Sequence, residues 1–403
     1  MYMNGMLVTA GEKQRPHAGL WGVNHYVPGR CYDGFTLFSP CWANDAYLVD
    51  MRGLVVHSWR VTHSNLAEIL PNGNLFTHHC GRWLEELTPA SETVWRWEGD
   101  ETLTAPTHHD FYYVNADHIV TLAARDEPVC TGIYPPRCEP PEMRTDFVLR
   151  INRDREIVWE FSFSEHLDEL CEMAGLPQPI PYRRRGPSGS WEPFGPKDWA
   201  HANTIEVLPD TPLGRRDARF KAGNILFSLR ELDTIGIIDP TLDAIVWCYG
   251  LGELDGQHQP TMLPNGNILI FDNGTFRGYS VAKEVDPVAG QIVWSFENGA
   301  DFFSPFRSGV QRLPNGNTLI CECDAGHLFE VTADKEIVWS YWSPLVAQGY
   351  QHLGKRIHRA TRYTAEQVSP VLASRPDVIY GELDAQGNPV TGYAEVIDLY
   401  RSW

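Results

Sequence analysis

The chain repeats a short pattern of apolar and polar positions that is typical of β-structure. Its first part is a pair of apolar or β-branched residues followed by Trp, and most copies come directly after a turn. The copies end at Trp95, Trp159, Trp247, Trp294 and Trp339, and at His57 in Val55-Val56-His57. Six copies of one short pattern predict six repeats of one structural unit.

A second part follows each of the first five copies: an apolar run, a tight turn and another apolar run. The turns contain Pro71-Asn72-Gly73-Asn74, Pro264-Asn265-Gly266-Asn267 and Pro314-Asn315-Gly316-Asn317, with degenerate copies at 113–117 and at 207–209 continued at 222–224. Asn-Gly between apolar runs indicates a β-hairpin, because a type I′ turn needs two residues with positive φ. Four short strands in about 40–50 residues are typical of a β-propeller blade.

The repeats predict an all-β fold, a six-bladed β-propeller with four-stranded blades. We expect blades at 65–98, 108–162, 201–249, 258–297 and 309–342, and a sixth blade that joins strands from 34–59 to chain after residue 351. Such closure leaves no free sheet edge. The domain organisation is therefore an N-terminal extension, 1–33, followed by a single propeller, 34–403.

Two long gaps in the repeat predict insertions, at about 126–146 and 163–200. The first is expected to be a loop with Pro and Cys residues. The second begins with an expected helix over 162–174, with a capping box from Ser162 to Glu165 and Gly175 as terminator. A Pro-, Gly- and Arg-rich stretch follows, so this insertion is expected to form a partly helical lid. Its arginines Arg183, Arg184 and Arg185 fit either a solvated surface run or contacts with an anionic substrate.

Composition narrows the possible functions. The 403 residues carry 33 Lys and Arg against 52 Asp and Glu, a formal net charge of −19, so binding to nucleic acid is not expected. No stretch approaches the roughly 20 apolar residues that span a bilayer, and the N-terminus does not resemble a secretory signal. Nine cysteines without zinc-type spacing predict free thiols in a reducing, cytoplasmic environment.

Candidate chemistry gathers at the starts of the expected inner strands. His109 and His258 occupy the same position relative to the following turn, and His201 begins the equivalent strand of the blade between them. Since inner strands start near the channel, three consecutive blades are expected to direct a histidine at one mouth. Arg230, at the expected end of the neighbouring strand, supplies a planar fork suited to an oxyanion. Asp110 is expected to orient one imidazole.

These residues carry a family resemblance. The order of the motifs is His108-His109-Asp110, His201-Ala202-Asn203, Gly223-Asn224-Ile225-Leu226 with Arg230, and Gly256-Gln257-His258 followed by the turn and by Asp272-Asn273-Gly274. Over roughly residues 34–343 the chain resembles the bacterial aryl-sulfate sulfotransferase family. It departs from that family at Gln259-Pro260, where members tend to have a small Asp-Ala pair.

The resemblance implies a sulfotransferase that works through a histidine intermediate and needs no cofactor. His258 would attack the sulfur of an aryl sulfate, and the sulfuryl group would then pass to a phenolic acceptor. His109, His201 and Arg230 would hold the sulfuryl oxygens, and one imidazole would transfer the proton. His108, Asp110 and Arg183–Arg185 would contact the substrate. The chain would be a short, cytoplasmic member acting on a small aromatic or anionic molecule, with no nucleic acid or membrane as partner.

Two other classes of function remain open from the sequence. In the first, His109, His201 and His258 bind a divalent transition metal, and the protein is a hydrolase, lyase or oxidase acting at the same mouth. Arg230 argues against this class, because a guanidinium beside a divalent cation is unfavourable without an anionic substrate. In the second, the propeller is not catalytic and binds a partner on its face. The sequence indicates neither the oligomeric state nor a role for 345–403.

Overall fold

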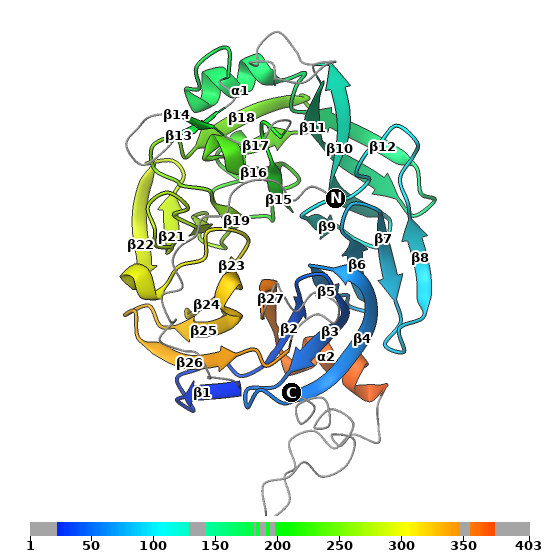
Figure 1. Ribbon diagram of the computed structural model, residues 1–403, viewed down its shortest axis with the longest axis vertical. Helices are drawn as coiled ribbons and strands as arrows, with labels where there is room; N and C mark the ends of the chain where they lie inside the picture. Colours follow the sequence, from blue (N-terminus) through cyan, green and yellow to red (C-terminus); the bar gives the residue numbers. More distant parts are fainter. Residues whose placement is uncertain are drawn as a thin grey trace, which may run out of the picture.

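The chain forms a closed ring of β-sheets around a central channel (Figure 1). The computed structural model describes residues 22–128, 142–180, 198–345 and 355–374, and the backbone of 183–185 and 191–193. Within these ranges six sheets follow one another around the ring, and each contains four strands in antiparallel order, one of them with an added fifth strand. The predicted fold class, an all-β six-bladed propeller with four-stranded blades, is confirmed.

Each blade runs from an inner strand at the channel to an outer strand at the rim. Blade 1 contains β5 (Ala67–Ile69), β6 (Leu75–His79), β7 (Trp83–Leu87) and β8 (Thr93–Trp97). Blade 2 contains β9 (Phe111–Tyr113), β10 (His118–Pro128), β11 (Glu142–Asn152) and β12 (Ile157–Ser162). Blade 3 contains β15 (Ala202–Val207), β16 (Ile225–Leu229), β17 (Thr234–Asp239) and β18 (Ala244–Tyr249).

The remaining blades continue the same order. Blade 4 contains β19 (His258–Met262), β20 (Ile268–Asp272), β21 (Val281–Asp286) and β22 (Gln291–Glu297). Blade 5 contains β23 (Gly309–Arg312), β24 (Thr318–Glu322), β25 (His327–Val331) and β26 (Ile337–Trp342). Blade 6 contains β27 (Ile357–Tyr363) as its inner strand, then β2 (Phe35–Pro40), β3 (Ala43–Val49) and β4 (Val55–Ser64).

Blade 6 joins the two ends of the described chain. Its inner strand β27 pairs with β2, and Phe35 lies opposite Tyr363, so the sheet that closes the ring combines early and late sequence. A strand that the sequence did not predict, β1 (Gly22–Tyr26), pairs with the outer strand β26 and gives blade 5 a fifth strand. The sequence signal was missing because β1 lies before the first copy of the repeat.

The repeated Trp residues hold neighbouring blades together. All five lie on outer strands, as predicted, and His57 occupies the same place on β4. The ring nitrogen of the repeat residue meets a carbonyl oxygen in the outer turn of the next blade in five of the six junctions. The pairs are His57 with Pro89, Trp95 with Arg153, Trp247 with Pro287, Trp294 with Ala333 and Trp339 with Met51, at 2.8–3.2 Å. The repeat therefore encodes contacts between blades as well as strands.

The insertions differ in detail from the sequence prediction. The expected loop at 126–146 is partly strand, because β10 extends to Pro128 and β11 begins at Glu142; the chain between them lies outside the described residues. Helix α1 (Leu167–Ala174) is shorter than predicted, since Ser162 ends β12 and the cap residue His166 makes no side-chain cap. Gly175 terminates the helix with φ 68°, as predicted.

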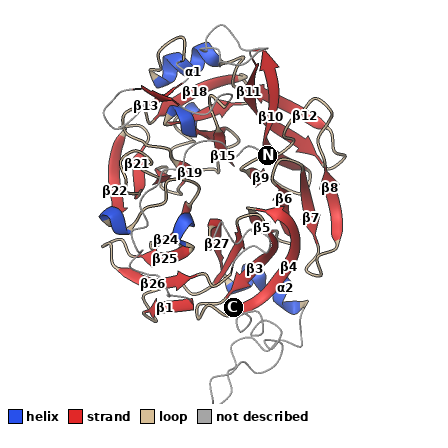
Figure 2. Ribbon diagram, viewed as in Figure 1, coloured by secondary structure: helices blue, strands red, loops and turns tan. Residues whose placement is uncertain are grey.

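The two α-helices lie at the periphery of the ring (Figure 2). Helix α2 (Ala365–Ala373) follows the closing strand β27 and begins with a capping box between Thr364 and Gln367. A short hairpin, β13 (Arg183–Arg185) with β14 (Trp191–Pro193), lies in the second insertion. Neither α1 nor α2, nor any other helix of the described ranges, has the length and apolar character to cross a bilayer.

Candidate functional site

The inner strands bring the predicted histidines to one mouth of the channel. His258 is the first residue of β19, His201 directly precedes β15, and His109 lies two residues before β9. The Nε2 atoms of His109 and His201 are 3.1 Å apart. Nη1 of Arg230 lies 3.2 Å from Nε2 of His201. Blades 2 and 3 thus place two imidazoles and a guanidinium in direct contact.

Two of these histidines have strained backbone. His109 has φ 58° and His201 has φ 51°, in the left-handed region that side-chain-bearing residues rarely adopt. Such strain costs of order 1–3 kcal/mol for each residue and persists where the surrounding structure fixes it. The hydrogen bonds of Asp110, Ala202 and Arg230 around these positions supply that constraint. The fold therefore holds the two imidazoles at the mouth at a cost in stability.

Three imidazoles form a continuous chain between two carboxylates. Nδ1 of His201 lies 2.5 Å from Asp198, and the Nδ1 atoms of His108 and His109 are 2.8 Å apart. At the other end, Nε2 of His108 lies 3.2 Å from Asp146. The order Asp146–His108–His109–His201–Asp198 is called the imidazole chain below.

The contacts of the imidazole chain constrain its protonation. Nε2 of His108 lies 3.2 Å from the carbonyl oxygen of Ala123, which can only accept, so Nε2 carries a proton. Burial lowers the pKa of His108 and, more strongly, that of His109, so these two rings are uncharged near pH 7. Burial would raise the pKa of Asp198, but His201 and Arg144 outweigh it and lower that pKa, which keeps the carboxylate charged opposite the chain.

His258 is fixed in one tautomer by a buried amide. Its Nδ1 lies 2.7 Å from Oδ1 of Asn273 and 3.1 Å from the carbonyl oxygen of Gly256. The amide cannot turn round, because Nδ2 of Asn273 donates to the carbonyl oxygens of Ser304 and Arg307. Both partners of Nδ1 accept, so the proton is on Nδ1 and the lone pair is on Nε2. In this structure Nε2 accepts a bond of 3.2 Å from the Arg307 amide.

His258 is also uncharged. Burial lowers its pKa well below the ordinary histidine value, and the charge of Arg230 lowers it further. Its side chain is 3% exposed. The pKa of His109 is likewise well below the ordinary value because of burial and the neighbouring imidazoles. A neutral imidazole with its lone pair on Nε2 is a competent nucleophile near pH 7.

Arg230 is placed by a turn and by an aromatic ring. The sequence analysis assigned it to the end of a strand, but β16 ends at Leu229 and Arg230 begins a short 3₁₀ turn, Arg230–Leu232. Its guanidinium lies over the ring of Phe306, 4.7 Å from the centroid, and Nε is 3.2 Å from Glu231. These contacts orient the fork toward the histidines, as an oxyanion site requires.

Asp110 does not orient an imidazole, contrary to the sequence prediction. Its carboxylate forms a two-bond ion pair with Arg359 of blade 6, at 2.9 and 3.0 Å, and accepts from the backbone amides of Phe111 and Ile205. Each carboxylate oxygen of Asp110 therefore already accepts two hydrogen bonds, from Arg359 and from a backbone amide. The carboxylates that do contact imidazoles are Asp198 and Asp146.

The backbone of the predicted arginine run lies near the channel mouth. Strand β13, which contains Arg183, Arg184 and Arg185, packs beside the turn that carries Arg230. The side chains of these three arginines lie outside the described part of the chain, so their contact with substrate stays a prediction. Asp198, near the end of the same insertion, makes a β-bridge with Arg144 and the bond to His201.

Sequence reasoning missed several residues of the site. Asp198, Asp146 and Asn273 contact the histidines, and the sequence pattern predicted a site role for none of the three. His358 on β27 lies near His258 and His109, and burial with the nearby Arg359 lowers its pKa well below the ordinary value. The sequence did contain a signal for His358, because His358-Arg359-Ala360-Thr361 has the same His-x-x-Thr pattern as His201-Ala202-Asn203-Thr204.

The histidines do not fit the three-histidine metal centre that the sequence left open. Among the described residues, no group of three or more His, Cys, Asp or Glu side chains is arranged to hold a metal ion. The guanidinium of Arg230 lies against Nε2 of His201, and Nε2 of His258 faces the Arg307 amide. A divalent cation would have to displace both donors.

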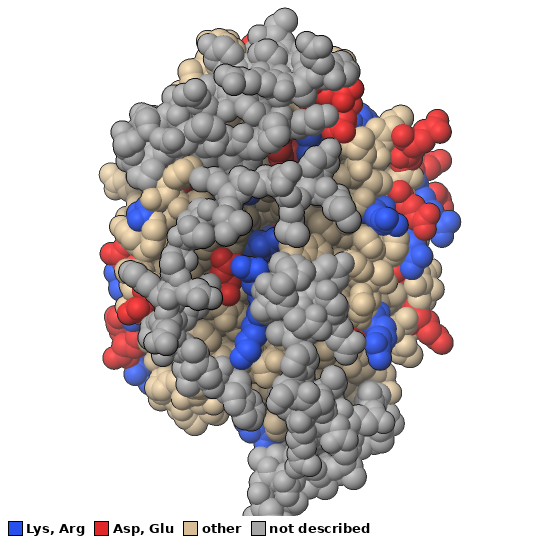
Figure 3. Space-filling view, viewed as in Figure 1, with Lys and Arg blue, Asp and Glu red and all other residues tan. Residues whose placement is uncertain are grey.

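The mouth is positive although the protein is acidic. Figure 3 shows Lys and Arg atoms in the central hollow of this face. The backbone amide of Arg307 bonds His258 at the mouth, and its guanidinium lies over Trp42, 4.9 Å from the ring centroid. Together with Arg230, this arrangement favours an anionic ligand.

Comparison with solved structures finds other proteins at low sequence identity. A protein of unknown function from Bacteroides caccae aligns with TM-score 0.49 and 11% identity, over 82% of this chain and 99% of that one. Streptogramin B lyase aligns with TM-score 0.41 and 11% identity, over 81% and 83%. Apo AztD from Citrobacter koseri aligns with TM-score 0.43 and 9% identity, over 82% and 98%. The comparison with curated protein sequences finds no match.

The match to a protein family is more informative than these alignments. The family model described as arylsulfotransferase (ASST) matches residues 68–344. That segment covers more than half of the chain and contains all four predicted catalytic residues, His109, His201, Arg230 and His258. On this ground the chain belongs to the arylsulfotransferase family.

Proposed function

We propose that the protein transfers a sulfuryl group from an aryl sulfate to a phenolic acceptor through a covalent intermediate on His258. The observation that carries the proposal is the state of His258: an uncharged ring whose Nδ1 proton is held by Asn273 and whose lone pair is on Nε2. Family membership supports a transferase of this class. A reaction of this kind needs no metal or organic cofactor.

In the first half-reaction, Nε2 of His258 attacks the sulfur and the bond from sulfur to the aryl oxygen breaks. The Arg307 amide, which bonds Nε2 at 3.2 Å, must yield at this step, and it can then donate to a sulfuryl oxygen. Arg230 and the imidazoles of His109 and His201 meet the oxygens as charge develops. For this step one imidazole of the chain enters the reaction protonated and donates its proton to the leaving phenolate.

In the second half-reaction the acceptor phenol returns a proton to the imidazole chain. Its oxygen then attacks the sulfur, the bond from sulfur to Nε2 of His258 breaks, and the starting state is restored. Asp146 and Asp198 hold the ends of the chain throughout, so that the proton can shift between rings without a net change of charge. One site therefore serves as the acid in the first step and as the base in the second.

The surroundings of the site are part of the proposal. The hairpin β13–β14, which packs beside the turn that carries Arg230, would act as a lid, with Arg183–Arg185 as its predicted contacts with the substrate. His108 would act on the substrate through His109, because its Nδ1 bonds that ring and its Nε2 faces Ala123 and Asp146. A cytoplasmic location is supported by the described cysteines, Cys31, Cys41, Cys80, Cys171, Cys248, Cys321 and Cys323, which are free thiols. The substrate is a small aromatic sulfate.

The proposal is tested by mixing the untagged protein with 4-nitrophenyl sulfate in the absence of acceptor. We expect a burst of nitrophenolate equal to the enzyme concentration, and a sulfuryl adduct on His258 by mass spectrometry of the quenched protein. Addition of a phenol should remove the adduct. Metal analysis of the same preparation is the control for the metalloenzyme class.

Two results would reject the mechanism. An adduct on another residue would move the nucleophile away from His258. Turnover that proceeds without any adduct, and that follows bound metal in stoichiometry, would replace histidine transfer with metal catalysis at the same mouth.

A further inference from the structure

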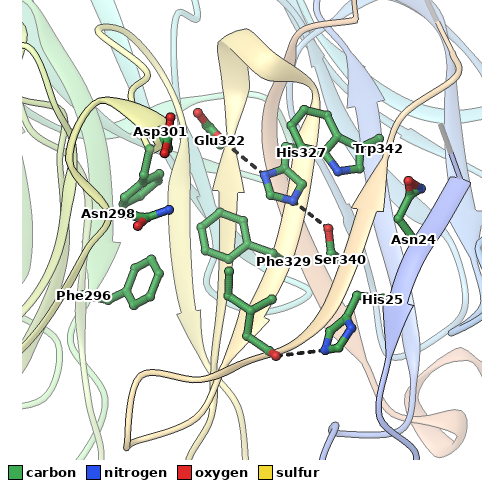
Figure 4. A pocket seen from close by; sticks show the side chains of 12 residues that line it. Asn24, His25, Phe296, Asn298, Asp301, Glu322, His327, Phe329, Ser340 and Trp342 are labelled. Carbon is green, nitrogen blue, oxygen red and sulfur yellow. Dashed lines mark hydrogen bonds and ion pairs between the residues drawn. The ribbon is translucent and has the colours of Figure 1, made fainter. Parts of the chain in front are cut away.

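A pocket that contains no residue of the imidazole chain lies between the outer parts of blades 4 and 5. It has a volume of about 460 Å³. Four aromatic side chains line it: Phe296, Phe302, Phe329 and Trp342. Figure 4 shows three polar side chains joined in a row on its floor, Glu322, His327 and Ser340. Nothing in the proposed transfer reaction uses them.

The three polar side chains have the arrangement of an activated serine. Nε2 of His327 lies 2.8 Å from Oγ of Ser340, and Nδ1 lies 3.1 Å from Oε2 of Glu322. A carboxylate on Nδ1 fixes the tautomer that leaves Nε2 free to accept the serine proton. The residues come from the adjacent strands β24, β25 and β26, so the sheet sets their spacing.

The imidazole is held rigidly. The ring of His327 stacks between Trp342, with centroids 4.0 Å apart, and Phe329, at 4.7 Å. The second carboxylate oxygen of Glu322 accepts from the amide of Phe303 at 3.1 Å. The base His327 and its carboxylate partner Glu322 are therefore both positioned before any ligand arrives, which is the condition for efficient general-base activation.

We propose that Ser340 is a nucleophile for acyl transfer from small, uncharged aromatic esters. The aromatic walls suit an apolar acyl or aryl group. The lining includes Asp301 and Glu322 and, among the described residues, no Lys or Arg, so an anionic ester is disfavoured. Asn298 stands across the pocket with its side-chain amide directed toward His327 and Phe329 (Figure 4).

The reaction balances without any co-reactant other than water. Oγ of Ser340 bonds to the ester carbonyl carbon while its proton passes to Nε2 of His327. The bond from that carbon to the alcohol oxygen breaks, and the alcohol leaves with the proton. Water then attacks the acyl-serine with His327 as base, and the carboxylic acid and free Ser340 are released.

A fluorophosphonate probe tests the inference, because it marks activated serines by displacement of fluoride. We expect one label on the wild-type protein, located at Ser340 by peptide mapping. Ser340→Ala should remove the label. His327→Gln should slow labelling by about 100-fold or more, and Glu322→Gln by about 10-fold, since the base and its orienting group are lost. Thermal unfolding of each variant confirms that it is folded.

Ser295 provides a matched control. It follows Trp294 on the outer strand β22 as Ser340 follows Trp339 on β26, but no imidazole among the described residues bonds it. Ser295→Ala should be labelled at the wild-type rate. Labelling of His327→Gln at the wild-type rate, or a label on any residue other than Ser340, would overturn the proposal and leave the three residues as a structural hydrogen-bond network. Hydrolysis of phenyl acetate by wild type but not by Ser340→Ala would extend it to turnover.

Discussion

The channel mouth and the rim pocket both hold histidine against carboxylate, but they differ in how the fold assembles them. At the mouth the side chains come from different blades, because inner strands converge on one axis. At the rim Glu322, His327 and Ser340 come from three adjacent strands of a single blade. Convergence at the axis adds the charges of several blades together, whereas the rim combines only local neighbours.

This difference decides the chemistry that each region can support. The mouth contains Arg230, the backbone amide of Arg307 and the imidazole chain, so it favours an anion and offers imidazoles for proton transfer. The rim pocket has a single imidazole between aromatic rings, and its charged lining residues are acidic. It therefore favours an uncharged ester. The predictions below test whether the two regions are separate sites and which residues are responsible at the mouth.

Replacement of the nucleophile should have the largest effect. His258→Asn preserves a polar side chain of similar size but removes Nε2, so aryl-sulfate transfer should fall by about 10⁴-fold or more. His118→Asn, at the start of β10 beside the turn from β9, is the control and should retain transfer within about twofold. Labelling of Ser340 in His258→Asn should proceed at the wild-type rate. Loss of both activities together would show that the two regions are one coupled site.

Replacement of Arg230, whose planar guanidinium would meet the sulfuryl oxygens, should have the next largest effect. Arg230→Lys keeps the charge but loses the planar fork that meets two oxygens, and we expect kcat to fall by about 100-fold. Arg312→Lys is the matched control, because Arg312, at the end of β23, bonds Glu284 of blade 4 and none of the channel histidines among the described residues. Steady-state kinetics should place the loss mainly in kcat. An unchanged kcat with a raised KM would assign Arg230 to binding alone.

Replacement of Asn273, the buried amide that fixes His258, should have a smaller effect on the rate, and it should also change the dependence of kcat on pH. Asn273→Ala removes the acceptor of the Nδ1 proton, and we expect kcat to fall by about 10- to 100-fold, in the range of lost orienting partners. Asn273→Asp places a negative charge beside Nδ1 and raises the pKa of His258. The neutral ring is the reactive form, so the acid limb of the kcat profile should move to higher pH. A role in folding alone predicts no such movement.

The repeat made the ring predictable, whereas side-chain partners across blades were not. Trp units and hairpin turns recur from blade to blade, so strand number and blade order follow from local sequence. The partner of His258 is Asn273, directly after the next strand β20, and the partner of His108 is Asp146, beyond an insertion. Such pairs depend on register and on loop conformation, which no local pattern encodes. Asp110 illustrates the same limit, since its actual partner Arg359 lies on β27 of blade 6, with blade 1 between the two blades.

The smallest effect concerns His78, a channel-side histidine that has no role in the proposed reaction. It is fully buried, neither ring nitrogen has a hydrogen-bond partner among the described residues, and burial lowers its pKa to about 3. The folded protein keeps this ring neutral, while the unfolded chain takes up a proton below about pH 6.5. His78 should therefore make the free energy of unfolding fall by about 1.4 kcal/mol per pH unit below pH 6.5.

His78→Leu should remove that contribution. We expect the variant to be more stable than the wild type by about 1 kcal/mol or more at pH 7, because an unpartnered buried polar group is lost, and the advantage should grow as the pH falls from 6.5 toward 4. Urea unfolding at a series of pH values measures the difference. The comparison cancels the opposite contribution of Glu68 and Glu206, whose carboxyl pKa values burial raises to about 7 and about 8. A constant difference across this pH range would mean that His78 takes up a proton in the folded protein as readily as in the unfolded chain.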